Sequence, residues 1–181
     1  EAKLDLMRRW CKEWQFRIGV HYLRSQISAK RAGAQYAELA EITLSIIWKE
    51  VLFEFAKKFG PEPGNGAAVI SMGSLGSGVL HANSDLDLII IYDADGNDQS
   101  EGDRSLSARQ YYSRLTKAFI TAISAPMSEG RLYEIDMRLR PSGFQGPVAT
   151  SWSSYQNYQK NEAWVWEHLA LTRARAVAGK G

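Results

Sequence analysis

The sequence contains few of the residues that define several common protein classes. Cys11 is the only cysteine among 181 residues, so no disulfide can form within the chain. Only three histidines are present, and they do not recur at the spacing of zinc ligands. No apolar run is long enough to span a bilayer or to act as a signal peptide. We therefore expect a cytoplasmic protein without zinc and without a membrane partner.

A strong excess of one charge is also missing. The 22 lysines and arginines nearly balance the 20 aspartates and glutamates, and no basic stripe with interleaved aromatic residues marks a polynucleotide track. Nucleic acid is therefore not an expected partner. The hydrophobic content of 45% is ample for the packed core of a chain of one-domain size. The charged N-terminal and uncapped C-terminal residues suggest that both ends continue in a longer polypeptide.

Proline is absent from the first 60 residues, which are rich in helix-forming side chains. At least two helices are expected there, the second near residues 37–59. Two prolines and three glycines in residues 60–66 then end the helical segment. The second helix carries apolar residues at spacings of three, four and seven that predict a packing stripe, namely Leu39, Ile42, Ile46 and Phe53.

Apolar runs and turn signals predict a small sheet after residue 66. Residues 67–72 and 86–92 are strand candidates, the second almost wholly apolar and so expected to be covered on both faces. The acidic residues 93–103 indicate a solvated loop, because their spacing does not fit a calcium loop. A helix is expected within residues 105–124, followed by a strand over residues 131–140.

Residues 131–140 alternate between apolar and polar side chains. This pattern predicts that Asp136, Arg138 and Arg140 share the polar face of one strand, which Pro141 ends. Aromatic-rich helical sequence follows to the C-terminus, where Arg173 is expected on the terminal helix.

Asp85 and Asp87 lie two residues apart at the start of the second strand candidate. Side chains two apart on a strand project to the same face, so both carboxylates are expected to meet one pocket. Their mutual repulsion requires a counter-ion, and hard oxygen ligands suit Mg²⁺ or Mn²⁺. Asp136 is a third candidate, if its strand joins the same sheet, and it would orient or deprotonate a nucleophile.

A run of small residues, GSLGSG at 73–78, precedes this acidic pair. Small residues allow backbone amides to approach a triphosphate, so Gly73, Ser74 and Gly76 are candidate nucleotide-binding residues. The order GxxGxG differs from the dinucleotide-binding GxGxxG, and no GxxxxGK[ST] is present. Ser84 is either a further helper or a turn residue.

A strand, a Gly-Ser turn and then DxD opening a second strand is typical of nucleotidyltransferases of the polymerase β type. The competing interpretation, in which Asp85 caps a turn and Asp87 is solvated, leaves the glycine turn and Asp136 unexplained. We therefore expect an α/β (α+β) protein in three parts: an N-terminal helical segment (1–60), a nucleotidyltransferase core with a small mixed sheet (61–150) and the start of a C-terminal helical region (151–181).

Three blocks of sequence make a resemblance specific. SMGSLGSGVLHANSDLDLIIIYD, YEIDMRLRPSGFQGPVATS and YQKNEAWVWEHLALTRARAVAG are together similar to the bifunctional glutamine synthetase adenylyltransferase/adenylyl-removing enzyme family. The resemblance implies that Asp85, Asp87 and Asp136 bind Mg²⁺ or Mn²⁺ and that Gly73 and Ser74 begin the nucleotide loop. It also implies ATP as a substrate, glutamine synthetase as the protein substrate, and the PII signal protein as a partner of the full-length enzyme.

Proteins of this family contain two related catalytic halves. The last two blocks look more like the adenylylating, C-terminal half, which moves AMP from ATP to a tyrosine hydroxyl and releases pyrophosphate. The deadenylylating half, which uses phosphate to release ADP, is the nearest alternative. A regulatory or protein-binding module with a weak site is another, because Ser74 stands where the family often has a lysine.

Because Ser74 replaces the lysine, another residue has to supply the positive charge that would contact phosphate. Arg138 and Arg140 are the candidates to contact phosphate, since a guanidinium matches phosphate oxygens, although either arginine can instead pair with Glu134. Arg173 and Arg175 are weaker candidates, for which surface ion pairing is an equally good explanation.

Overall fold

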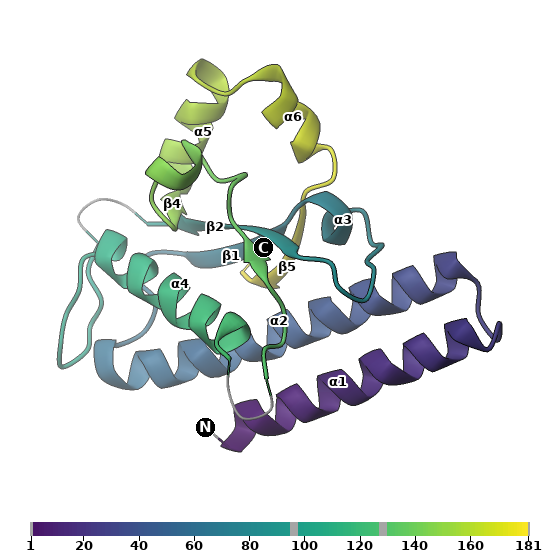
Figure 1. Cartoon of the computed structure of the whole chain (residues 1–181). Coiled ribbons are helices and arrows are strands. Elements are labelled where there is room, and N and C mark those ends of the chain that lie inside the picture. Colours follow the sequence, from purple (N-terminus) through teal and green to yellow (C-terminus); the bar gives the residue numbers. More distant parts are fainter. Residues whose placement is uncertain (1, 95–97, 127–129, 181) are drawn as a thin grey trace.

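A computed structural model describes residues 2–94, 98–126 and 130–180. The chain begins with two long antiparallel helices, α1 (Ala2–Leu23) and α2 (Ala29–Phe59), which pack side by side (Figure 1). The Ser28 hydroxyl caps α2 by accepting a hydrogen bond from the Arg31 amide at 3.2 Å. At the other end, the Gly60 amide donates to the Ala56 carbonyl at 2.8 Å. The predicted helical segment and its end after Phe59 are confirmed.

A small mixed sheet follows the hairpin. Strands β1 (Gly66–Ser71) and β2 (Leu86–Asp93) pair antiparallel, which confirms both predicted strands. Strand β5 (Arg175–Gly179) pairs antiparallel with the other edge of β1. Strands β3 (Ile135–Asp136) and β4 (Thr150–Ser151) run parallel to β2 and pair with its two ends. The resulting order is β3-β2-β1-β5, with β4 also beside β2.

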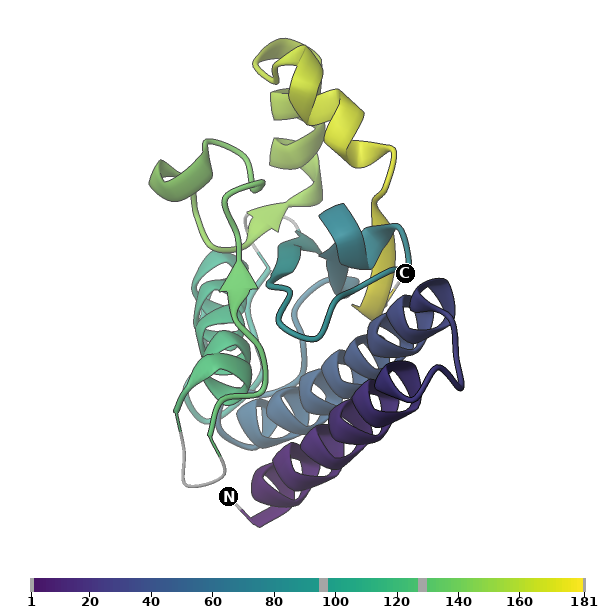
Figure 2. The same ribbon diagram turned by 45° about the vertical axis from the view of Figure 1, so that its right-hand side comes forward.

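Helices cover both faces of this sheet, as the apolar character of β2 predicts. Leu86, Leu88 and Ile90 belong to the main core, which the sheet forms with α1, α2 and α4 (Ala108–Ser124). Ile89 faces the other way and packs with Tyr155 of α5 (Trp152–Asn161). Helix α6 (Val165–Leu171) lies beside α5 on this second side (Figure 2). The period-two alternation of β2 therefore defines an α2 face and an α5 face.

Two short elements complete the chain. The glycine-rich residues after β1 form one helical turn, α3 (Gly73–Gly76), and a 3-10 turn, η1 (Gly143–Gln145), precedes β4. Among the described helices, none combines the length and the apolar character that crossing a membrane requires. Part of the predicted acidic loop, residues 95–97, lies outside the described residues.

Two buried tyrosines hold the connection between the helical hairpin and the sheet. The hydroxyl groups of Tyr111 and Tyr112, both on α4, donate to the carbonyls of Gly60 at 3.0 Å and Pro63 at 2.6 Å. Burial raises the pKa of Tyr111 to about 12, so both functions of the phenol, core packing and hydrogen bonding, require its neutral form.

The expected packing stripe of α2 is largely wrong. Leu39 is buried, but Ile42, Ile46 and Phe53 are 42%, 45% and 56% exposed. The core instead receives the opposite side of the helix, including Leu44, Ile47 and Trp48. Apolar residues occur on both sides of α2, so periodicity alone does not decide which side packs.

The strand expected over residues 131–140 is also mostly wrong, because only Ile135 and Asp136 of this range form a strand. Strand β3 ends at Asp136, because the Asp136 carboxylate accepts the amide of Arg138 at 2.8 Å and turns the chain. The Arg140 amide then donates to the Met137 carbonyl at 3.2 Å. Arg138 and Arg140 therefore lie in a turn and do not continue the face of a strand.

The terminal helix ends earlier than the sequence predicts. Helix α6 stops at Leu171, and Arg175 begins β5, where its carbonyl accepts a hydrogen bond from the Ser71 hydroxyl at 3.2 Å. Strand β5 pairs an edge of β1 that would otherwise present free backbone groups. This long-range pairing overrides the helical preference of its alanine-rich sequence.

The adjacent isoleucines of α2 test which side of the helix is the core side. Ile47→Ala removes a side chain that is 1% exposed and is expected to lower the free energy of unfolding by about 2–5 kcal/mol. Ile46→Ala makes the same chemical change at a half-exposed position and is expected to cost well under about 1 kcal/mol. Urea unfolding of both variants measures the difference; equal losses would contradict the assignment of the two faces.

Candidate active site

The acidic pair lies where β2 begins, on the α5 face of the sheet. Leu86 and Leu88 point into the main core, so Asp85 and Asp87 project from the opposite side of the chain. Asp85 is exposed, whereas Asp87 is half-buried. Asp85 and Ser84 line a groove of about 370 Å³ that also includes Tyr133 and Glu134.

The glycine turn after β1 is in direct contact with Asp87, one member of this acidic pair. Gly73 has a φ of +53°, and a Cβ atom on it would lie only 2.1 Å from Oδ2 of Asp87. The Met72 amide, one residue earlier, donates to the Asp87 carbonyl at 2.8 Å. The predicted nucleotide loop and the predicted acidic residue therefore meet because glycine leaves room for a carboxylate.

Asp136 lies beside this pair on the neighbouring strand. It is the register partner of Asp87 in the parallel pairing of β2 with β3. Its carboxylate accepts from the Arg138 amide at 2.8 Å and from the Arg138 Nε at 2.6 Å. The third carboxylate is thus adjacent to the first two, and in this structure it is paired with an arginine.

The environment shifts the pKa values of Asp87 and Asp136 in opposite directions. Burial raises the pKa of Asp87, the charge of Asp136 raises it further, and Arg138 opposes this rise. Hydrogen bonding from Arg138 lowers the pKa of Asp136. The centre therefore holds more negative charge than Asp87 tolerates without cost, which is the condition that a bound cation relieves.

The side chains are not arranged as a finished metal site. Within residues 2–94, 98–126 and 130–180, no three His, Cys, Asp or Glu side chains form a group that could hold an ion. The donor types nevertheless fit a hard divalent cation, because carboxylate oxygens from two adjacent strands face one side of the sheet. Each oxygen of Asp136 already accepts a hydrogen bond from Arg138, so an ion bound by all three carboxylates would share Asp136 with this arginine or displace it.

The remaining predicted loop residues have definite local roles. Ser74 is exposed, and its carbonyl accepts the Ser77 hydroxyl at 3.0 Å. Gly76 is buried, and a Cβ atom there would lie 1.9 Å from the carbonyl oxygen of Arg173. The Ser84 hydroxyl accepts the His81 amide at 3.0 Å, which is the turn role that the sequence left open. Nucleotide binding by Ser74, Gly76 and Ser84 stays a prediction.

The four candidate arginines occupy different environments. Arg140 is buried and donates to the carbonyl of Met137 at 2.8 Å, so it braces the turn after β3. Arg138 is exposed and bound to Asp136, not to Glu134. The charge of Arg173 opposes, with a smaller effect than that of Arg138, the rise that burial causes in the pKa of Asp87. Arg175 contacts the glycine turn, a position that the expected terminal helix did not indicate.

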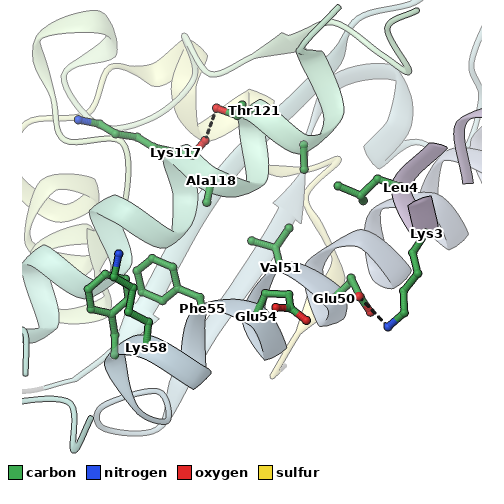
Figure 3. A pocket seen from close by; sticks show the side chains of 12 residues that line it. Lys3, Leu4, Glu50, Val51, Glu54, Phe55, Lys58, Lys117, Ala118 and Thr121 are labelled. Atoms are coloured by element: carbon green, nitrogen blue, oxygen red, sulfur yellow. Dashed lines mark hydrogen bonds and ion pairs between the residues drawn. The ribbon is translucent and has the colours of Figure 1, made fainter. Parts of the chain in front are cut away.

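A larger groove, of about 860 Å³, lies away from the acidic centre between α1, α2 and α4 (Figure 3). Its walls include Leu4, Val51 and Phe55, and an ion pair of 2.8 Å joins Lys3 to Glu50 at one end. None of the predicted site residues lines it. The groove therefore does not compete with the acidic centre as the candidate site.

A mixed sheet with a glycine turn held against one carboxylate, and two more carboxylates nearby, is compatible with a nucleotidyltransferase-like domain. The family model for glutamate-ammonia ligase adenylyltransferase matches residues 1–181. The chain therefore belongs to the glutamate-ammonia ligase adenylyltransferase family.

Curated relatives agree with this membership. The chain is 46% identical over 180 residues to the bifunctional glutamine synthetase adenylyltransferase/adenylyl-removing enzyme of Mesorhizobium japonicum. It is 46% identical to the enzyme of the same name from Brucella suis and 44% identical to that from Xanthobacter autotrophicus. Each match covers 99% of this chain and 18% of the relative. The chain thus spans less than a fifth of the length of these relatives.

Two glycines with the same backbone angle test the contact between the turn and Asp87. Gly73 and Gly143 both have a φ of +53°, but a Cβ atom on Gly143 would meet nothing closer than 3.7 Å. Both alanine substitutions should cost about 1–2 kcal/mol for the left-handed backbone, and Gly73→Ala should cost more because it displaces the carboxylate. Urea unfolding compares them; equal losses would show that the contact is unimportant.

The opposite pKa shifts predict how Arg138→Met behaves with pH. Without the guanidinium, the pKa of Asp136 should rise and that of Asp87 should rise further, as measured by NMR titration of the carboxyl carbons. A lowered pKa stabilises the fold above the unfolded-state pKa, and this contribution disappears as the pH falls through the folded-state value. The variant should therefore be less stable at neutral pH, with a difference that fades in acid.

Arg131→Met is the matched control for this titration, because Arg131 pairs with the exposed Glu134 two residues from Asp136. It should leave both pKa values unchanged. An unaltered Asp136 pKa in Arg138→Met would contradict the assigned cause.

Proposed function

We propose that this chain is an adenylyltransferase domain that moves AMP from ATP to a tyrosine hydroxyl of glutamine synthetase and releases pyrophosphate. Its family and the names of its relatives support the reaction class and the protein substrate. The observation that carries the proposal is the contact of the Gly73 turn with Asp87, beside Asp136. This contact places the backbone of the glycine turn, which can approach phosphate groups, next to carboxylates that can bind a cation.

In the proposed reaction, the tyrosine oxygen bonds to the α-phosphorus of ATP. The bond from that phosphorus to the oxygen bridging to the β-phosphorus breaks, and pyrophosphate leaves with the electron pair. The turn at Gly73–Gly78 positions the triphosphate. Asp136 orients the hydroxyl by accepting its hydrogen bond, and the proton of the hydroxyl passes to water as the bond to phosphorus forms.

Asp85, Asp87 and Asp136 are the residues that would hold Mg²⁺ or Mn²⁺. Such an ion would supply charge stabilisation for the phosphate oxygens and would offset the burial and the repulsion by Asp136 that raise the pKa of Asp87. Arg138 has a second role in this proposal. Before ligands bind, Arg138 neutralises the charge of Asp136. Once released from Asp136, its guanidinium can contact a phosphate oxygen and so replace the charge of the loop lysine that the family often has.

The adenylylating direction is supported by the block that ends in AWVWEHLALTRAR. Its last residues lie directly against the turn, since the Arg173 carbonyl occupies the space where a Gly76 side chain would be. The sequence that resembles the adenylylating half therefore adjoins the proposed nucleotide loop. Regulation by the PII signal protein is a proposal for a longer polypeptide, because this chain leaves more than four-fifths of the Mesorhizobium japonicum relative unmatched.

Asp87→Asn tests the proposal by separating activity from stability. Removing the charge should reduce AMP transfer from ATP to purified glutamine synthetase by at least about 100-fold with either Mg²⁺ or Mn²⁺. It should also leave the folded state as stable or more so, because the half-buried charge is removed from its acidic neighbours. The measurements are incorporation of labelled AMP and thermal unfolding.

Asp93→Asn is the control for this variant, because Asp93 lies at the far end of the same strand and accepts from Asn65 at 2.9 Å. It should retain AMP transfer. Full activity of Asp87→Asn would refute the assignment. Release of ADP from adenylylated glutamine synthetase with phosphate, without AMP transfer, would instead identify the deadenylylating half. Absence of ATP binding by calorimetry would favour a regulatory module.

A further inference from the structure

Arg175 connects three parts of the chain that are far apart in sequence. It is the first residue of β5 and the register partner of Ser71, the last residue of β1. Its Nε donates to the Gly76 carbonyl at 2.9 Å, and one of its terminal nitrogens donates to the Leu75 carbonyl at 3.1 Å. The same guanidinium forms an ion pair with Glu41 on α2. A single side chain thus joins the C-terminal strand, the glycine turn and the helical hairpin.

The guanidinium is suited to this task by its shape. Its donors are arranged in a rigid plane, so contacts with two successive carbonyls and a carboxylate can be made at once. Glu41 accepts hydrogen bonds from both terminal nitrogens of Arg175, one of them from Nη1 to Oε2 at 3.4 Å, and so holds the guanidinium in place. A lysine has a point charge and cannot keep all three partners in this geometry.

The glycine turn therefore contacts different groups at its two ends. At the end of the turn, the carbonyl of Arg173 lies so close that Gly76 has no room for a side chain. At the start of the turn, Gly73 lies against the carboxylate of Asp87. Leu75 and Gly76 are buried between these contacts. A displacement of the turn away from Arg175 would consequently change the distance between its backbone and the acidic centre.

We infer that Arg175, held by Glu41, is a positioning residue that keeps the turn at Gly73–Gly78 in place to receive the triphosphate. The inference rests on the proposed function, because it assigns the turn to ATP. Arg175 acts through the turn and does not itself touch the nucleotide. Its side chain is 45% exposed, so its main contribution is to the placement of the turn and not to the stability of the core.

Substitutions at Arg175 should weaken nucleotide binding more than the chemical step. Arg175→Met is expected to raise the dissociation constant for ATP, measured by calorimetry with Mg²⁺, by about 10-fold, and to raise KM for ATP similarly with a smaller change in kcat. Arg175→Lys should fall between Arg175→Met and the unchanged chain. Glu41→Gln keeps Arg175 but removes the carboxylate that binds it, so this variant should raise the dissociation constant for ATP by a few-fold.

Hydrogen exchange provides a readout that does not depend on activity. The amides of Gly76 and Gly78 donate to the carbonyls of Met72 and Leu75 at 2.8 Å and 2.9 Å, within the turn that Arg175 holds. These amides should exchange faster in Arg175→Met and in Glu41→Gln. Strand β2 should keep its protection, which separates movement of the turn from unfolding of the sheet.

Two matched changes control for the loss of a surface ion pair. Glu50→Gln removes a carboxylate from the same helix as Glu41, where it pairs with Lys3, and Arg17→Met removes an exposed arginine that pairs with Glu13. Both should leave the ATP dissociation constant and the exchange of the turn unchanged.

The outcomes distinguish this inference from the proposed function. If the unchanged chain binds no ATP, the proposed function fails. If it binds ATP and the Arg175 and Glu41 variants bind it equally well, with unchanged exchange at Gly76 and Gly78, the positioning role is refuted. A loss of kcat with an unchanged KM would also overturn it, because that result would place Arg175 in the chemical step.

Discussion

At Gly73, the backbone of the turn after β1 passes so close to Asp87 that a methyl group would lie 2.1 Å from the carboxylate. This contact determines how the other parts of the centre can be arranged. The turn has to begin with a glycine. Strands β1 and β2 must also stay in register, so that the Met72 amide can donate to the Asp87 carbonyl. Helices on both faces of the sheet hold that register by packing the alternate residues of β2.

The acidic centre combines two carboxylates with opposite electrostatic surroundings. Asp87 is half-buried and surrounded by negative charge, whereas Asp136 is paired with Arg138. A site of this kind has a cost in the free structure, because the half-buried charge of Asp87 lies beside Asp136, and a bound cation can reduce that cost. The charges of the centre thus support the proposed binding of a divalent cation, and the family supports the proposal of ATP as the substrate.

The C-terminal residues belong to the centre even though they are distant from it in sequence. Strand β5 completes the sheet beside β1, and its first residue reaches the glycine turn and α2 at once. The block AWVWEHLALTRAR, on which the proposed adenylylating direction rests, thus ends next to the proposed nucleotide loop.

The sequence by itself determined β1, β2, the long helices and the identity of the acidic and glycine residues, because these depend on local periodicity and on residue chemistry. Tertiary structure alone decided which side of α2 is buried, since apolar residues such as Ile46 and Ile47 occur on both sides. It also ended β3 at Asp136, through a hydrogen bond to the Arg138 amide, and turned residues 175–179 into a strand. Arg175 and Glu41 meet across 134 residues of chain, and no local pattern encodes a contact made only when separate elements pack.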